Sequence, residues 1–183
     1  MVAVNGTLHK LSPKCKWVAL AMGSNVVLHN TTTAEQRFLV GAATLVEFST
    51  DESVLWYLVG TTLHRYTIAT STDDTFPANS IYMISRDRFL ASSNAAAPFA
   101  YQLVTTTAAT TVFTNAASAS TLGGAAYALT DCAVTCTFRT LGTQATASST
   151  LSGAVPTTAS VDGNNSNGEW YLLRTTAPAS ILV

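Results

Sequence analysis

The sequence predicts an all-β fold, an antiparallel sandwich or barrel with little helix. Threonine is the commonest residue, with 30 copies among 183, and this β-branched residue favours strands. Between Cys132 and Thr140, apolar and polar residues alternate cleanly, which places them on opposite faces of a strand. A third indication is the pair of β-rich runs that flank Gly60-Thr61, because their spacing is that of a hairpin.

The remaining strands are expected from their composition. Each is rich in β-branched, aromatic or large aliphatic residues, and turn-forming residues separate most of them. In chain order, the expected strands are residues 2–8, 17–22, 26–30, 37–40, 44–48, 54–59, 62–68, 80–84, 101–106, 110–114, 132–140, 145–149 and 169–175.

Two segments carry a helical alternative. Thr33-x-x-Gln36 has the form of a capping box ahead of residues 37–48, but Gly41 and several β-branched residues weaken a helix there. The segment from Ala116 to Ala128 is rich in alanine, and two consecutive glycines interrupt it. We therefore expect strand or loop in both segments and keep a helix as the alternative.

Charge is scarce and unevenly distributed. Charged residues are 10% of the chain, against about 25% in an ordinary soluble domain. Residues 1–88 carry 14 of the 19 charged side chains, whereas residues 89–130 carry none. We expect a β-rich region over residues 1–90 with most charges, then an Ala/Thr/Ser-rich β region over 91–183 that closes with a C-terminal strand. The sequence leaves open whether these are two domains or one.

The charge balance excludes some partners. A net charge of −1 leaves no basic surplus to neutralise nucleic-acid phosphates or an anionic lipid surface. No apolar run approaches the roughly 18 residues that a membrane span needs. Lys14 and Lys16 precede the apolar run 17–22, which is too short for the core of a signal peptide. We expect no direct nucleic-acid partner and no membrane.

The uncharged tract is interpreted as a buried interface. Obligate interfaces between subunits are depleted in charge, and closed assemblies bury the same patch in every copy. We therefore expect the chain to associate with copies of itself, as a trimer or higher. The expected interface residues are Tyr101, Leu103, Val112, Phe113 and Tyr127.

The cysteines and acidic loops predict no cofactor and no metal. In a strand, the sulfurs of Cys132 and Cys136 would lie about 13 Å apart, which excludes a disulfide bridge and leaves two small buried side chains. The three cysteines, with Cys15, form no disulfide framework. The loop at 162–169 resembles a calcium loop, but it lacks the glycine at the sixth position and has Leu173 at the twelfth. Turn chemistry explains it better, with calcium as the alternative.

No catalytic constellation is recognisable, and we expect no enzymatic activity. The three histidines, His9, His29 and His64, are well separated and lie beside apolar residues in expected strands. The acidic pairs at 51–52 and 73–74 lie in turn-like stretches and are interpreted as solvated loops. No phosphate-binding glycine motif occurs.

The Ala/Thr/Ser tract 91–158 and the closing segment 163–171 give the chain a resemblance to small β-rich structural proteins of tailed bacteriophages. The resemblance implies a multicopy, non-enzymatic virion protein, such as a capsid decoration (cement) protein or a tail or fibre component. Its partners would be other virion proteins, and it would assemble in the host cytoplasm. A viral capsid shell protein is an alternative, although the basic N-terminal arm of many such proteins is missing here.

A ligand-binding β-module, an adhesin or a carbohydrate-binding protein, is the other alternative. Such a module presents exposed aromatic residues on a platform. On this reading the ligand-facing residues are Trp170 and Tyr171, which lie in the last expected strand.

Overall fold

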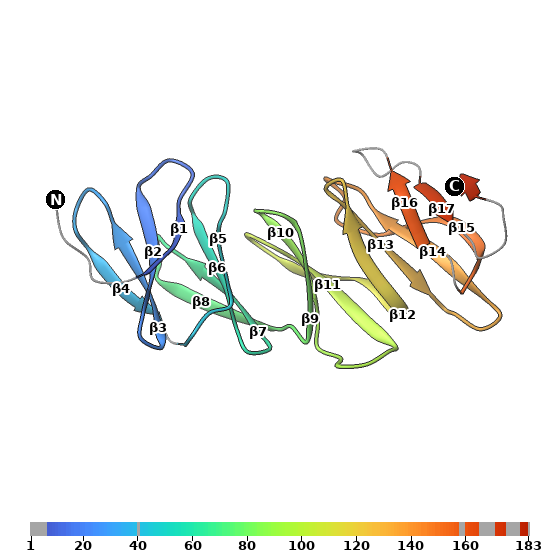
Figure 1. The fold of residues 1–183 in the computed structure, drawn as a ribbon, viewed down its shortest axis with the longest axis horizontal. Helices are drawn as coiled ribbons and strands as arrows, with labels where there is room; N and C mark the ends of the chain where they lie inside the picture. The colour runs from blue at the N-terminus through green and yellow to red at the C-terminus, as the bar shows by residue number, and fades with distance from the viewer. Residues whose placement is uncertain (1–6, 40, 158–159, 165–170, 175–179, 183) are drawn as a thin grey trace. The chain divides into compact units, whose positions relative to one another are not determined.

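The computed structural model describes residues 7–39, 41–157, 160–164, 171–174 and 180–182 (Figure 1). Within these residues the chain forms β-strands and no helix, and every strand pair that the structure defines is antiparallel. The all-β prediction is confirmed. The expected sandwich or barrel is not confirmed, because the strands form successive sheets in which each strand pairs with its neighbours in the sequence.

Two compact units divide the chain, Met1–Ala78 (unit 1) and Asn79–Val183 (unit 2). The boundary lies in the connection between two strands, ahead of the composition change near residues 89–91. That change falls inside a strand of unit 2, Arg88–Ser92, whose five residues are all buried.

Unit 1 consists of two four-stranded meanders, which we call sheet A and sheet B. In both sheets the spatial order of the strands is their order in the sequence. Sheet A contains β1 (Thr7–Leu11), β2 (Trp17–Met22), β3 (Asn25–Asn30) and β4 (Gln36–Leu39). Sheet B contains β5 (Leu45–Phe48), β6 (Val54–Val59), β7 (Thr62–Thr67) and β8 (Thr72–Pro77).

One hydrophobic cluster joins the two sheets of unit 1. Alternate residues of β3, including Val26 and Leu28, face sheet B, and alternate residues of β6, including Leu55 and Tyr57, face sheet A. These side chains are almost fully buried. The first strands of the two sheets, β1 and β5, also contact each other. Packing of one sheet face on the other therefore holds unit 1 together, with about 25 cal/mol gained per Å² of apolar surface removed from water.

Unit 2 contains a seven-stranded sheet, sheet C, and a three-stranded sheet. The strand order in sheet C is again the sequence order. Sheet C contains β9 (Ser80–Ser85), β10 (Arg88–Ser92), β11 (Phe99–Thr105), β12 (Ala109–Leu122), β13 (Ala125–Thr130), β14 (Thr135–Leu141) and β15 (Ser149–Pro156). The smaller sheet contains β16 (Ser160–Asn164), β17 (Tyr171–Arg174) and β18 (Ser180–Leu182).

Strand β12 belongs to two halves of sheet C. Its first half pairs with β11 and its second half pairs with β13, and the two pairings meet at Ala116. Asn115 has a φ of +51°, and the register with β13 shifts between Ala116 and Ser118. A left-handed residue beside a register shift is the geometry of a β-bulge, which bends a strand. A single 14-residue strand thus connects two four-stranded groups.

The core of unit 2 accounts for the side chains that were expected at an interface. Tyr101, Leu103, Val112 and Phe113 belong to one buried cluster, in which Phe113 is opposite Tyr101 across β11 and β12. Their exposed fractions are between 0 and 7%. Tyr127 is half-buried and packs beside Phe138. Four of the five residues therefore contact the chain's own interior, and an apolar strand face needs no second subunit to explain its lack of charge.

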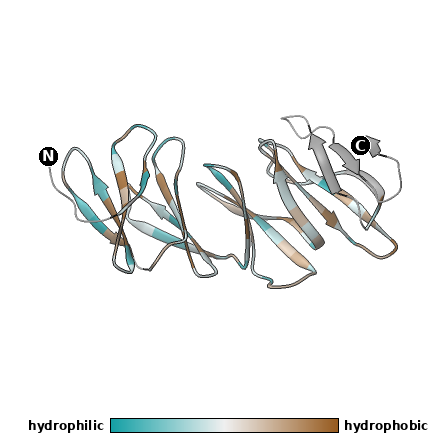
Figure 2. Cartoon of the chain, viewed as in Figure 1, coloured by the Kyte–Doolittle hydropathy of each residue, from teal (hydrophilic) through white to brown (hydrophobic). Residues whose placement is uncertain are grey.

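Figure 2 shows hydrophobic and hydrophilic segments alternating along the strands of both units. The helical alternatives are wrong: residues 37–48 contain most of β4 and all of β5, and residues 116–128 contain the second half of β12 and most of β13. Propensity is overridden here by burial, because Ala126 and Ala128 are completely buried in the core of unit 2. The Gly123-Gly124 pair, which interrupts the alanine tract, forms the turn between the two strands with positive φ at both residues.

Candidate functional site

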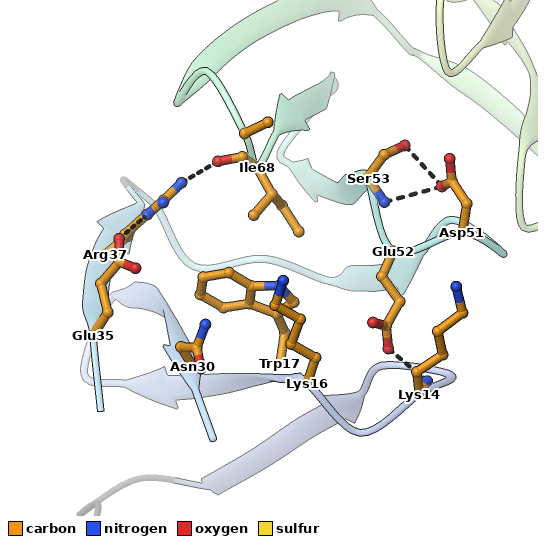
Figure 3. A pocket seen from close by; sticks show the side chains of 11 residues that line it. Lys14, Lys16, Trp17, Asn30, Glu35, Arg37, Asp51, Glu52, Ser53 and Ile68 are labelled. Atoms are coloured by element: carbon orange, nitrogen blue, oxygen red, sulfur yellow. Dashed lines mark hydrogen bonds and ion pairs between the residues drawn. The ribbon is translucent and has the colours of Figure 1, made fainter. Parts of the chain in front are cut away.

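Four hairpin turns converge at one end of unit 1, which we call the loop end. They connect β1 to β2, β3 to β4, β5 to β6, and β7 to β8. Alternate connections of a meander lie at the same end of the sheet, so each sheet contributes two turns. The turns surround a cavity of about 530 Å³ (Figure 3). Its lining residues are Lys14, Lys16, Trp17, Asn30, Glu35, Arg37, Asp51, Glu52, Ser53, Ile68 and Ala69.

The β1–β2 turn is fixed by hydrogen bonds at its base. The backbone N–H of Ser12 donates to the carbonyl of Trp17, and the N–H of Trp17 donates to Ser12 Oγ at 3.0 Å. Cys15 occupies the left-handed region with a φ of +59°. The hydroxyl of Thr31 donates to the carbonyls of Cys15 and Lys16. The backbone of this turn is therefore held on both sides, by its own sheet and by the neighbouring β3–β4 turn.

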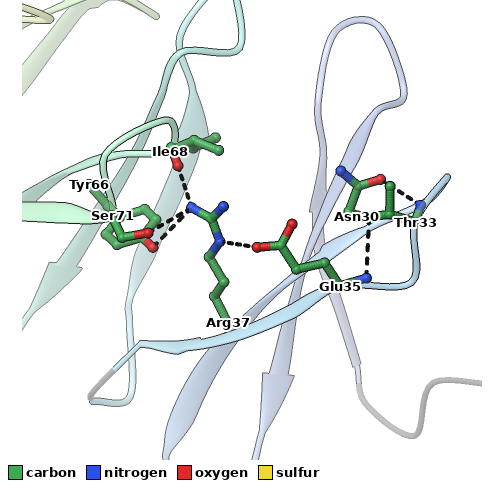
Figure 4. Close-up of polar contacts among 7 residues, drawn as sticks. All are labelled: Asn30, Thr33, Glu35, Arg37, Tyr66, Ile68 and Ser71. Carbon is green, nitrogen blue, oxygen red and sulfur yellow. Dashed lines mark hydrogen bonds and ion pairs between the residues drawn. The ribbon is translucent and has the colours of Figure 1, made fainter.

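The β3–β4 turn is organised by a buried amide. Asn30 is 4% exposed, and its Oδ1 accepts hydrogen bonds from the backbone N–H groups of Thr32 and Thr33. Such a side-chain-to-backbone bond two or three residues ahead closes an Asx-type turn. Glu35 follows, with its backbone N–H donating to Thr33 Oγ1 at 3.4 Å (Figure 4).

Trp17 and Arg37 form one wall of the cavity. The indole of Trp17 is 4% exposed, and the Arg37 guanidinium lies over it with 5.4 Å from Cζ to the ring centroid. The Nε of Arg37 donates to Glu35 Oε1 at 2.7 Å. A cation over an aromatic face and an ion pair in the plane of the guanidinium together fix the orientation of this side chain.

Arg37 also crosses from sheet A to sheet B. Its Nη1 donates to the phenol oxygen of Tyr66, to the Ile68 carbonyl, and to Ser71 Oγ at 3.0 Å (Figure 4). The hydrogen bond to Tyr66, followed by the one to Glu35, raises the pKa of Arg37. The guanidinium is therefore a permanent charge that links the β7–β8 turn to β4.

The β5–β6 turn provides two carboxylates that are already engaged. Asp51 Oδ1 accepts from Ser49 Oγ at 2.7 Å, from Ser53 Oγ at 2.7 Å and from the Ser53 backbone N–H at 2.9 Å. The backbone bond from Ser53, then the two hydroxyls, lower the pKa of Asp51 to about 2. Glu52 is 7% exposed, with a φ of +65°, and its Oε1 accepts from the backbone N–H of Lys14 at 2.5 Å.

The two lysines are the uncompensated groups of the cavity. Lys14 and Lys16 are exposed, and among the described residues no hydrogen bond or ion pair of their ammonium groups is found, while Glu35, Asp51 and Glu52 have partners. Figure 3 shows the side chain of Lys16 in front of the Trp17 ring, whereas that of Lys14 lies beside Glu52 and points toward Asp51. Ammonium groups without a partner can donate hydrogen bonds to a ligand.

The acidic pairs were interpreted as solvated loops, and the structure agrees with this interpretation only in part. Asp51 and Glu52 do lie in a turn, but Glu52 is buried. Asp73 and Asp74 lie in β8, opposite Tyr66 and Arg65 of β7, and Asp74 Oδ2 pairs with Arg65 at 2.7 Å. The cross-strand partners, which are distant in sequence, stabilise a strand where the local sequence resembles a turn.

The histidines are not brought together. His9 is exposed and His29 is buried in β3 with an unpartnered Nδ1. His64 stacks on Tyr57 with 4.3 Å between ring centroids, and its Nδ1 lies 3.0 Å from Asp73 Oδ2. The Tyr57 hydroxyl donates to the same oxygen at 2.6 Å. This cluster connects three strands of sheet B, in keeping with a structural role.

The exclusion of a disulfide between Cys132 and Cys136 is wrong. The two residues are bonded, with 4.1 Å between their Cα atoms. The 13 Å estimate assumed an extended strand, but β14 begins at Thr135, and Cys132 lies in the turn before it, where the N–H of Ala133 donates to the Thr135 carbonyl. Cys15 is free and exposed.

Several expected features lie outside what the structure describes. Trp170 and the loop residues 165–169 are not described, and neither is the side chain of Tyr171. Within the part of the chain that the structure describes, no group of three or more His, Cys, Asp or Glu side chains is placed to hold a metal ion. In the same residues, no helix is long and apolar enough to cross a membrane.

Sequence reasoning missed the loop-end cavity. Trp17 and Arg37 are separated by two turns and a strand, so no local pattern connects them. The only signal was the Lys14-Cys15-Lys16-Trp17 run, in which two cations flank a turn and an aromatic residue follows.

No protein-family model matches the chain, and no curated protein matches it. Solved structures do resemble it. The crystal structure of the eukaryotic initiation factor is 15% identical, with a TM-score of 0.59 over 100% of this chain and 53% of that chain. The β-propeller domain of the Trilobed protease from Pyrococcus furiosus is 12% identical, with a TM-score of 0.48 over 92% and 63%. The C-terminal WD40 domain of Sif2 is 11% identical, with a TM-score of 0.46 over 94% and 66%.

The chain spans 53 to 66% of the length of these structures. At such low identity, the likeness to the initiation-factor structure concerns the fold alone. It extends over the whole chain and agrees with a succession of antiparallel sheets.

Proposed function

We propose that the chain is a non-enzymatic binding module built from propeller-type blades, and that it binds its partner at the loop end of unit 1. Propellers repeat four-stranded antiparallel sheets of consecutive strands. Sheets A and B have this order, and β12 divides sheet C into two further groups of four. The blade assignment therefore rests on topology, and the binding end rests on the cavity.

The observation that carries the proposal is a preformed cavity between fixed turns. Binding residues are disproportionately found on loops that a rigid scaffold positions, and ligand cavities commonly measure about 300–1,000 Å³. The cavity of about 530 Å³ is lined by all four turns. Each turn is held by its own hydrogen bonds, so little ordering entropy would be lost when a ligand binds.

The test is a peptide-display selection on the wild type, followed by binding measurements on a variant whose cavity is filled by a larger side chain. Ala69 lines the cavity and is exposed, so Ala69→Trp fills the cavity without removing a hydrogen bond that the structure defines. Ala108→Trp, at an exposed turn of unit 2, is the matched control. Peptides selected on the wild type should bind the control variant equally and lose binding to Ala69→Trp. Selected peptides that bind both variants alike, or no enriched peptides at all, would contradict the proposal.

A second candidate is a subunit of a homo-oligomeric assembly such as a virion. The favouring observation is that the exposed side chains of β11 and β12, including Gln102, Thr111 and Thr114, are uncharged. Uncharged faces pack against other chains without the cost of desolvating ions. Sedimentation equilibrium at micromolar concentration should then give a trimer or a larger species, and a monomer would exclude this candidate.

A further inference from the structure

We infer that the loop-end cavity recognises an oxyanion on a peptide side chain, a carboxylate or a phosphate, and that Lys14 and Lys16 bind it. The inference rests on the proposed function, because it names the ligand class of the same site. It depends on which charged groups of the cavity have a hydrogen-bond or ion-pair partner within the chain and which have none.

The acidic groups of the cavity serve the turns. One oxygen of Asp51 accepts three hydrogen bonds from Ser49 and Ser53. Glu52 accepts a hydrogen bond from the backbone N–H of Lys14, and Glu35 accepts one from the Nε of Arg37. Hydrogen bonds to the ionised form stabilise a carboxylate. These bonds fix the three carboxylates on their turns, whereas neither lysine ammonium group has a partner within the described residues.

The basic groups are available. Within the described residues, the ammonium groups of Lys14 and Lys16 have no partner in the chain, and they leave the same short turn on either side of Cys15. The hydrogen bonds of Arg37 use Nε and Nη1, so Nη2 remains as a further donor on the cavity wall. Ammonium and guanidinium donors form their strongest hydrogen bonds with carboxylate and phosphate oxygens.

The cavity also accommodates the group that carries the oxyanion. Its volume, about 530 Å³, is far larger than a single anion needs. Ile68 and Ala69 form an apolar part of its wall. A glutamate or phosphoserine side chain would place its carbon atoms against this wall and its charge between the lysines, which commits the ligand to a peptide and not to a free ion.

The experiment is a titration with three peptides that differ only at one central position, monitored by NMR at the Trp17 indole N–H. The first peptide carries glutamate there, the second phosphoserine, and the third alanine as the neutral reference. The glutamate and phosphoserine peptides should bind saturably and the alanine peptide should not. Phosphoserine, with a charge of about −1.5 to −2, should bind more tightly than glutamate and lose more affinity as salt is raised.

Variants of the two lysines test whether their ammonium groups bind the oxyanion. Lys14→Gln and Lys16→Gln should each weaken binding by about three- to fivefold, as expected for exposed charge pairs, and the double variant should weaken it by about nine- to 25-fold. Arg139→Gln in unit 2 removes one positive charge elsewhere and should leave affinity unchanged. Equal binding by the double variant, or an equal loss in Arg139→Gln, would overturn the inference.

The outcomes separate this inference from the proposed function. One outcome is that Ala69→Trp prevents peptide binding while the lysine variants do not change it. This result would refute oxyanion recognition and leave the proposed binding module intact. Peptides that bind regardless of Ala69→Trp would refute both.

Discussion

The guanidinium of Arg37 lies 5.4 Å from the centroid of the Trp17 indole ring, although the two residues belong to strands that do not pair with each other. Trp17 begins β2 and Arg37 lies in β4, with β3 between them. Arg37 continues to Tyr66 and Ser71 of sheet B. One side chain thus joins the cation–π contact within sheet A to the hydrogen bonds between the two sheets.

Arg37→Lys should destabilise the protein although the charge is kept. Lysine lacks the planar fork that bonds to Glu35 on one side and to the β7–β8 turn on the other. Loss of a network of this kind costs about 1–3 kcal/mol, to be measured as the free energy of unfolding in urea. Arg139→Lys, at a half-exposed position, is the control and should be nearly neutral. A difference below about 0.5 kcal/mol between the two variants would show that the network contributes little.

Tyr57→Phe should lower the free energy of unfolding by about 1–2 kcal/mol, because the lost hydroxyl donates to Asp73 at 2.6 Å from a buried position. Burial, and then the bond to Asp73, raises the pKa of Tyr57, so the phenol is neutral and donates at every physiological pH. The measurement is a double-mutant cycle with Asp73→Asn. Additive effects in the cycle would mean that the two side chains are not coupled.

Asp51 makes stability depend on pH at the acidic end. Its pKa is lowered from 3.8 to about 2 in the folded chain, so the unfolded chain binds a proton first as the pH falls. The contribution of Asp51 is complete above about pH 4 and is lost between pH 4 and pH 2. Asp51→Asn should therefore be less stable than the wild type at pH 7, by a small amount because the side chain is exposed. Urea denaturation at several pH values should show this difference shrinking below pH 4, and a constant difference would contradict the assignment.

Strands with strong local signals could be predicted from the sequence. The strand 17–22 and the hairpin around Gly60-Thr61 are found with nearly the expected bounds, because both combine β-rich runs with a glycine that accepts positive φ. β8 was missed, since its stability comes from partners in β7 and its own sequence contains two aspartates. The sheet arrangement was also missed, because a sandwich and a succession of meanders share the same alternation.

The candidate site could not be predicted from local sequence. The cavity needs the β1–β2 turn and the β7–β8 turn to meet, and these are more than 50 residues apart. The interface assignment is untested and stays a prediction, but its main argument is weakened. Absence of charge was taken as a sign of contact with other chains, whereas Tyr101 and Phe113 are buried in the core of unit 2. Charge depletion alone does not distinguish a subunit interface from a domain interior.

The thiol content should change with reduction. Cys15 is free and exposed, and the other two cysteines form a disulfide. A thiol reagent should titrate one group in the native chain and three after unfolding and reduction, and Cys15→Ser should remove the native reaction. Replacing both Cys132 and Cys136 by serine should cost about 2 kcal/mol, the chain-entropy value for a five-residue loop. Three reactive thiols in the unreduced, unfolded chain would show that the disulfide does not form.

Phe113→Ala distinguishes a core residue from an interface residue. Phe113 is completely buried beside Tyr101, and truncation of a buried phenylalanine costs about 3–5 kcal/mol through lost transfer energy and the cavity that remains. If the side chain belongs to the core, this loss should be the same at 1 μM and at 100 μM protein, because unfolding of a single chain does not depend on concentration. Thr114→Ala, at the next and exposed position, should change stability little and serves as the control. A destabilisation that grows with dilution would instead place Phe113 between subunits, since the stability of an obligate oligomer depends on protomer concentration.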